Sequence, residues 1–220
     1  MTKPPTLRFR LKGVEPEPHA AAPTLALRLG IEADGRPVQS VVLAAQVRIV
    51  VTRRPHDAAT RERLRDLFGE PGAWHASAHS LLWAQATATV PAFEGSTEFR
   101  MLVPCTYDLD VAAAKYLHAL DGGAIPVELL FSGTLFWTDE ADALHAALVP
   151  WQSEAHGDVP VEVWREAMDR CFHGTAWLRL RTDTLRQLAL FRARGAFATW
   201  DEAFASLLAE ETGSLDVREA

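Results

Sequence analysis

The sequence predicts an α+β protein, in which an antiparallel β-sandwich with short inserted helices is followed by a C-terminal segment of about three helices. Apolar and polar residues alternate from Ser40 to Thr52, which is typical of a strand with one buried face. The same alternation occurs earlier, over residues 7–12 and 25–32. Half-solvated strands at such short intervals favour antiparallel sheets. After Trp151 the period changes from 2 to 3.6, which indicates amphipathic helices.

A short helix is expected after the third strand. Asp57 can cap its start, and Gly69 is suited to its end. Alternation resumes over Trp83–Val90 and again over 99–103, with a turn rich in proline and glycine between them. This arrangement predicts a β-hairpin.

The next helix is predicted over Val111–Leu120, with Asp108 or Asp110 as its capping residue. It precedes a long strand, Ile125–Trp137, whose two faces are both apolar. Such a strand is expected at the centre of a sheet. Within it, Gly133 predicts a β-bulge or a close approach of another backbone.

Three helices are predicted in the last third of the chain. The first opens at Asp158 and Pro160, and the second covers Thr184–Arg194. The third begins at a capping box formed by Thr199 and Glu202.

The predicted domains are a β-sandwich over residues 1–151 and a helical segment over residues 158–212. A chain of 220 residues, 48% of them hydrophobic, can form a substantial core. The polar connector 152–158 permits the helices to pack on the sandwich or to form a separate bundle. Packing on the sandwich is the arrangement we expect.

Charge and composition favour a cytoplasmic protein that has no membrane span and does not bind nucleic acid. The net charge of −7 is uneven, since residues 1–103 carry 13 basic and 10 acidic side chains and residues 104–220 carry 9 and 19. An acidic half repels phosphate backbones. No apolar stretch approaches the roughly 20 residues of a membrane span, and the first residues lack an apolar signal segment. Cys105 and Cys171 are expected to be reduced.

The densest group of polar side chains lies at and after Cys105. A cysteine just before a helix can become reactive when the helix N-terminus lowers its pKa, but two nearby aspartates oppose that effect. Capping and packing explain most of these residues equally well. The candidate functional cluster consists of Cys105, Tyr107, Asp108, Lys115 and His118.

No metal or cofactor is predicted. His75 and His79 have the spacing of two ligands on one helical face, but the third ligand is missing and the segment resembles a loop. Cys171 and His173 could chelate an ion, but Cys171 falls on the apolar stripe of its helix.

A partner-binding surface is predicted around the connector and the first C-terminal helix. Trp137 and Trp151 flank the connector, and protein interfaces are enriched in tryptophan. Acidic residues off the apolar stripe of the helix should be solvated and could steer a partner. These residues are Glu162, Glu166 and Asp169.

The chain resembles an uncharacterised bacterial family, a domain of unknown function, over nearly its whole length. Members of the family are often encoded beside [NiFe]-hydrogenase structural and maturation genes, but no activity is established for them. The resemblance rests on these segments: Val103-Pro-Cys-Thr-Tyr-Asp108, Ala113-Ala-Lys-Tyr116, Leu130-Phe-Ser-Gly-Thr134, Val149-Pro-Trp151, Val163-Trp-Arg165, Ala176-Trp-Leu-Arg-Leu180 and Thr199-Trp-Asp201.

Two classes of function are consistent with these observations. The first, which we favour because no catalytic motif is present, is a non-catalytic interaction or assembly protein. The resemblance implies that its partner is a hydrogenase subunit or maturation factor. The second is a small enzyme or metal-handling protein built around Cys105, Tyr107, Asp108 and His118. A pocket that joins these side chains would favour the second class.

Overall fold

The computed structural model describes residues 3–34, 37–70, 72, 74, 79–175 and 177–216. The chain divides into two compact units, Met1–Trp177 and Leu178–Ala220. The first unit contains two antiparallel sheets and several helices, which confirms the predicted α+β class. The second unit contains the helices α6 (Thr182–Arg194) and α7 (Trp200–Asp216).

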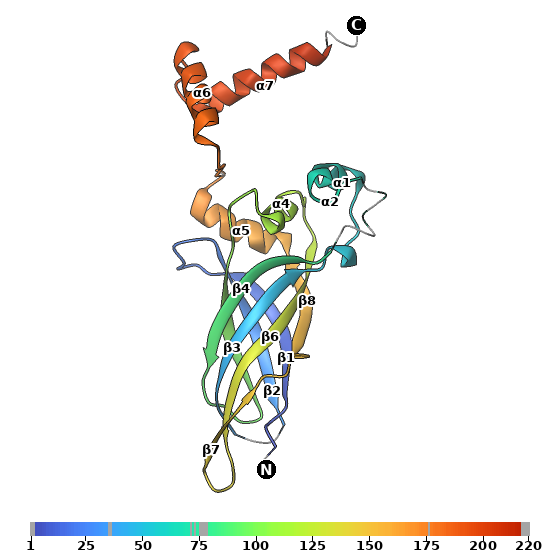
Figure 1. The fold of residues 1–220 in the computed structure, drawn as a ribbon, viewed down its shortest axis with the longest axis vertical. Coiled ribbons are helices and arrows are strands. Elements are labelled where there is room, and N and C mark those ends of the chain that lie inside the picture. The colour runs from blue at the N-terminus through green and yellow to red at the C-terminus, as the bar shows by residue number, and fades with distance from the viewer. Residues whose placement is uncertain are drawn as a thin grey trace. The chain divides into compact units, whose positions relative to one another are not determined.

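The two sheets are formed by eight strands within the described residues (Figure 1). The first sheet has the order β1-β2-β5, with strands Leu7–Pro16, Thr24–Ala33 and Ser96–Pro104. The second sheet has the order β4-β3-β6-β7, and β8 also pairs with β6. Its strands are β3 Val38–Ile49, β4 Leu81–Val90, β6 Ala124–Thr138, β7 Leu144–Leu148 and β8 Glu154–Pro160. The predicted hairpin of β4 and β5 is wrong, because the two strands pair with different neighbours and lie in different sheets.

Both sheets contribute to one hydrophobic core. The apolar positions of the alternating strands point inward, as the period of two predicted. Phe9 of β1 stacks on Phe131 of β6, with ring centroids 4.2 Å apart, so residues of the two sheets meet directly. At the edges, Gly157 of β8 lies so near Leu11 of β1 that an added Cβ would be 2.6 Å from a leucine methyl carbon.

The predicted close approach at Gly133 is confirmed. Its φ of +143° is accessible to glycine and rarely adopted by other residues. A Cβ at this position would lie 2.0 Å from the carbonyl oxygen of Val42, on the neighbouring strand β3. Glycine therefore allows β3 and β6 to pair closely at this point.

The third strand ends earlier than predicted. β3 stops at Ile49, and Val51–Arg53 forms a 3-10 helix (η1) instead of continuing the strand to Thr52. The neighbouring strand β6 pairs with β3 from Val127 onward, and the residue before it, Pro126, has no N–H to donate a hydrogen bond. The amide of Val50 still donates to the carbonyl of Pro126 at 2.8 Å, and the pairing ends there.

The segment expected as a polar connector is largely strand β8. Glu154, His156 and Asp158 face outward, while Ala155 and Val159 are buried. This alternation is short and weakly apolar, so pairing with β6 decides the conformation. Strand β7, which the sequence analysis did not predict, forms on the same edge of β6.

The first inserted helix is split in two. α1 (Ala58–Arg63) begins where predicted, because the Asp57 carboxylate accepts a hydrogen bond from the Thr60 amide at 2.7 Å. A second short helix, α2 (Arg65–Phe68), ends at Gly69, whose φ is +75°.

Capping of α4 (Ala112–His118) differs from the prediction. Val111 occupies the N-cap position, and no side chain caps the helix. The Asp108 carboxylate instead accepts a hydrogen bond from the Asp110 amide at 3.0 Å, which shapes the preceding turn.

The three predicted C-terminal helices are present. α5 (Val161–Phe172) follows β8 directly and buries Trp164, Ala167 and Met168 in the core of the first unit. In the second unit, the capping box of α7 is confirmed, since the Glu202 amide donates to Thr199 Oγ1 at 3.1 Å. Among the described residues, no helix has the length and apolar character needed to cross a membrane.

Replacing Gly133 with alanine should lower the free energy of unfolding by at least about 2 kcal/mol, because the Cβ meets backbone that cannot move without disturbing the ladder. Urea denaturation measures this change. Gly72→Ala is the matched control, since an added Cβ there meets no atom within 4 Å, and it should change stability by less than about 0.5 kcal/mol. Equal effects of the two substitutions would contradict the close approach.

Candidate functional site

A pocket of about 280 Å³ opens beside α5. α5 lies at the same end of the sheets as α1, α2 and α4 (Figure 1). The pocket is one of several hollows in the described residues, and it is notable because five of its nine lining residues are aromatic or imidazole side chains. The lining residues are Tyr107, His118, Trp164, Arg165, Met168, Asp169, Phe172, Thr175 and Trp177.

The position of α5 determines the wall of the pocket. The amide of Val161, the first residue of α5, donates to the carbonyl of Gly123 at 2.8 Å. One turn later, Arg165 donates to the carbonyls of Leu120 and Asp121, the latter at 2.8 Å. These carbonyls follow the C-terminus of α4, so one guanidinium joins the two helices.

The tie between the helices places His118 of α4 against Trp164 of α5. Their rings meet edge to face, with centroids 4.9 Å apart. Burial and, to a smaller extent, the positive charge of Arg165 lower the pKa of His118 below its ordinary value of 6.5. The imidazole in the pocket is therefore neutral at pH 7.

Tyr107 also lines the pocket. Its ring lies 5.3 Å from that of Phe172 and 6.1 Å from that of Trp177, between centroids. Tyr107 and Trp177 are 45% and 62% exposed, so both present aromatic surface to solvent. The pocket is thus bordered by aromatic side chains that a binding partner can reach.

The remaining members of the candidate cluster do not line the pocket. Cys105 is buried, and burial raises the pKa of its thiol to about 12, so it is protonated at neutral pH. Lys115 donates to the Asp66 carboxylate at 2.7 Å, and this hydrogen bond raises the pKa of the lysine. Asp108 contributes to the turn before α4. Tyr107 and His118 are the two predicted residues that the fold brings together.

The predicted partner surface is divided by the fold. Trp137 is 3% exposed and stacks on His145, so it belongs to the core. Trp151 is 84% exposed. On α5, Glu162, Glu166 and Asp169 are exposed, as their places off the apolar stripe predicted, and Asp169 also lines the pocket.

Sequence reasoning missed Arg165, Phe172 and Trp177 as site residues. The spacing of Phe172 places it on the apolar stripe of its helix, and nothing local marks Arg165 as a link to α4. The pairing of Trp177 with Tyr107 joins residues 70 positions apart, and no periodicity reveals such a contact.

A second aromatic cluster near α2 was also missed. The imidazole Nε2 of His56 lies 2.9 Å from the hydroxyl oxygen of the buried Tyr116. Burial is the main cause that raises the pKa of Tyr116 to about 12 and lowers that of His56. Phe68 and Trp74 pack around the pair. We assign this cluster a packing role, because its hydrogen bond and ring contacts are internal.

The pocket lining includes two side chains of metal-binding type, His118 and Asp169. Catalytic zinc sites use three protein ligands, so the described lining has one ligand too few for such a site. Of the histidine pair considered from the sequence, His75 lies outside the described residues. Both cysteines are free thiols.

These features define an α+β protein with two antiparallel sheets and a small aromatic pocket beside a helix. The chain belongs to a family of unknown function, DUF6084, whose model matches residues 4–215. The expected membership in an uncharacterised family is confirmed in this way. No curated protein matches the chain.

Cys105 should resist alkylation in the folded protein. With a pKa of about 12 in place of 9.0, its thiolate fraction at pH 8 is about a thousand-fold smaller than that of an unperturbed thiol. Mass spectrometry after iodoacetamide treatment of Cys171→Ser measures the reaction at Cys105 alone. In denaturant the same cysteine should react at an ordinary rate. Rapid modification of the folded variant would contradict the burial of the thiol.

His118 should titrate below pH 6.5, which NMR of its imidazole protons can measure. Arg165→Gln should raise this pKa only in part, because burial is the larger cause, whereas Arg165→Lys keeps the charge and should change it less. Because the unfolded chain binds the proton more readily, His118 should reduce stability as the pH falls below 6.5. A titration midpoint above 6.5 would contradict the assigned environment.

Proposed function

We propose that this protein is a non-catalytic interaction or assembly protein that binds a protein partner through α5 and the pocket beside it. The observation that carries the proposal is the exposed aromatic border of the pocket, Tyr107 and Trp177, next to the acidic side chains of α5. Aromatic residues at the centre of a contact surface commonly supply most of the binding energy.

The volume of the pocket supports a protein ligand. Pockets for drug-sized molecules measure about 300–1,000 Å³, and this pocket, at about 280 Å³, is just below that range. One apolar or aromatic side chain of a partner fits within it. The rest of the partner would then lie across the exposed face of α5.

The indole of Trp164 adds a polar group. Its indole N–H is buried and lacks a hydrogen-bond partner among the described residues. A buried donor without an acceptor costs about 1–3 kcal/mol, and a partner could supply an acceptor only if its binding exposed this N–H.

The charges on α5 define the flanks of the bound segment of the partner. Glu162, Glu166 and Asp169 are exposed, and Glu166 already pairs with Arg170 at 2.6 Å. The acidic residues favour a partner with basic residues beside the inserted side chain, and they would accelerate association at low salt.

The resemblance of the chain to proteins encoded near [NiFe]-hydrogenase genes makes a hydrogenase subunit or maturation factor the first partner to test. In this proposal the protein acts in the cytoplasm, and its two sheets form a sandwich that carries the binding surface. The alternative of a small enzyme or metal-handling protein built around Cys105, Tyr107, Asp108 and His118 is less well supported, because Cys105 is buried and does not line the pocket.

Reversal of Glu162, Glu166 and Asp169 to lysine should reduce recovery of the partner when the tagged chain is isolated from its native host and analysed by mass spectrometry. Trp177→Ala, which removes part of the pocket border, should also reduce recovery, with a loss of affinity of roughly ten-fold or more expected for a central tryptophan. Binding of the partner by the reversed variant should be less sensitive to salt concentration than binding by the unaltered protein.

The control for charge is reversal of Glu94, Glu140 and Asp158, which are exposed acidic residues outside α5. Trp151→Ala is the control for loss of an exposed tryptophan. If Trp151→Ala abolishes recovery and Trp177→Ala does not, the binding surface lies elsewhere. If Cys105→Ser alone abolishes a hydrogenase phenotype while the α5 variants are unchanged, a thiol-based role replaces the binding role.

A further inference from the structure

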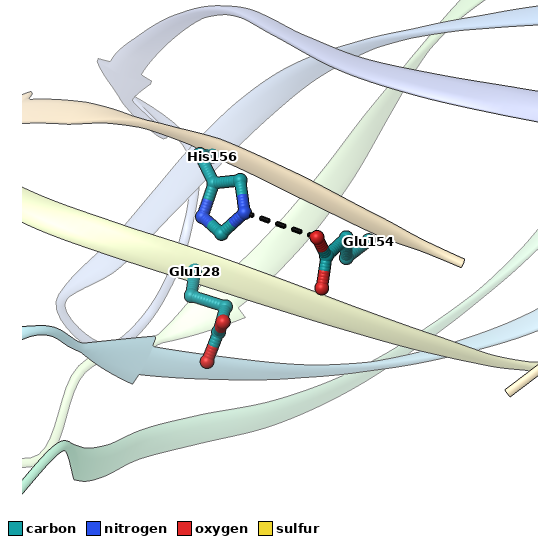
Figure 2. Close-up of side chains that lie close together, drawn as sticks. All are labelled: Glu128, Glu154 and His156. Atoms are coloured by element: carbon teal, nitrogen blue, oxygen red, sulfur yellow. Dashed lines mark hydrogen bonds and ion pairs between the residues drawn. The ribbon is translucent and has the colours of Figure 1, made fainter. Parts of the chain in front are cut away.

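Three side chains with metal-binding atoms lie together on the outer face of the second sheet, away from the residues of the pocket. Glu128 of β6 is the direct cross-strand partner of His156 on β8. Glu154 precedes His156 by two residues and therefore shares its face of the strand. Figure 2 shows the three side chains close together, with His156 Nε2 3.3 Å from Glu154 Oε1.

We infer that Glu128, Glu154 and His156 form a binding site for a divalent transition-metal ion. One ligand atom from each residue lies within 4.8 Å of the other two. An ion bound at 2.0–2.2 Å requires each atom to move inward by roughly 0.7 Å at most. Glu154 and His156 are exposed, so rotation of their side chains allows this movement.

The donor set selects the class of ion. An imidazole nitrogen with two carboxylate oxygens suits zinc and its first-row neighbours, whereas calcium and magnesium prefer oxygen ligands alone. Three protein ligands on an exposed sheet face leave further coordination positions open to water. The site therefore resembles open metal sites in ligand number and differs from closed four-ligand structural sites.

The strands hold the ligands in place without the ion. β6 is paired with β3 on one edge and with β8 on the other. Next to the ligands, Leu129 and Ala155 point into the core and are buried. Because both strands are fixed by packing, the backbone spacing of Glu128 and His156 is set before an ion binds.

The site was not predictable from residue spacing, and it departs from our expectation that the chain binds no metal. Glu128 lies 26 positions from Glu154 and 28 from His156, so no local motif contains all three residues. Antiparallel pairing of β6 and β8 brings them together.

Arg48 is expected to weaken metal binding at this site. It is the cross-strand partner of Glu128 on β3, opposite the side on which His156 lies. Its positive charge should weaken binding of a cation to the same carboxylate. Neutralising Arg48 should therefore tighten binding, which is a result that loss of structure would not produce.

The test is isothermal titration of the full chain with Zn²⁺, with visible absorption of Co²⁺ as a second probe. One equivalent should bind, and Glu128→Gln or His156→Ala should each weaken binding at least about ten-fold, since loss of outer-sphere contacts alone often costs that much. Arg48→Gln should strengthen binding by about five-fold at low salt. His19→Ala, at an exposed histidine elsewhere, should leave binding unchanged.

Circular dichroism establishes that each variant is folded, and Glu154→Gln replaces any variant that is not. A dissociation constant above roughly 1 mM for Zn²⁺ would overturn the inference. Binding that is unaffected by Glu128→Gln and His156→Ala would also overturn it, because the ion would then occupy another site. Neither result bears on partner binding by α5, which is measured by recovery of a protein.

Discussion

The pairing of β3 with β6 is the constraint on which much of the first unit depends. The carbonyl of Val42 occupies the space where any other residue at position 133 would place its Cβ, so the ladder requires Gly133. β6 then carries β7 and β8 on its other edge. Everything attached to β8, including α5, takes its position from this ladder.

The pocket follows from the way in which β8 continues into α5. Pro160 ends the strand and Val161 begins the helix. The amide of Val161 donates a hydrogen bond to the carbonyl of Gly123, which lies beyond α4. Arg165 then donates to the carbonyls of Leu120 and Asp121, which lie just beyond the end of α4. This guanidinium links the positions of the two helices, and the aromatic wall of the pocket results from the link.

Burial separates the polar residues of the chain into different environments. Cys105 follows a core strand and is protonated because charge is unfavourable where water is excluded. His118, only partly buried, remains at the surface of the pocket as a neutral ring. Glu128 and His156 project from the opposite face of strands whose other side chains form the core. The fold thus buries a thiol just beyond β5 of the first sheet and presents carboxylates and an imidazole to solvent on the second.

The sequence by itself determined the α+β class, the long strands and the ends of several helices, because these depend on local periods and caps. The strand predicted at Ile125–Trp137, the cap at Asp57 and the glycine at 133 were each visible as local patterns. Tertiary structure alone decided that 154–160 is a strand, since its pairing with β6 outweighs its weak alternation. It also decided which side chains meet, because contacts such as Tyr107 with Trp177 join residues far apart in the chain and leave no periodic signal in it.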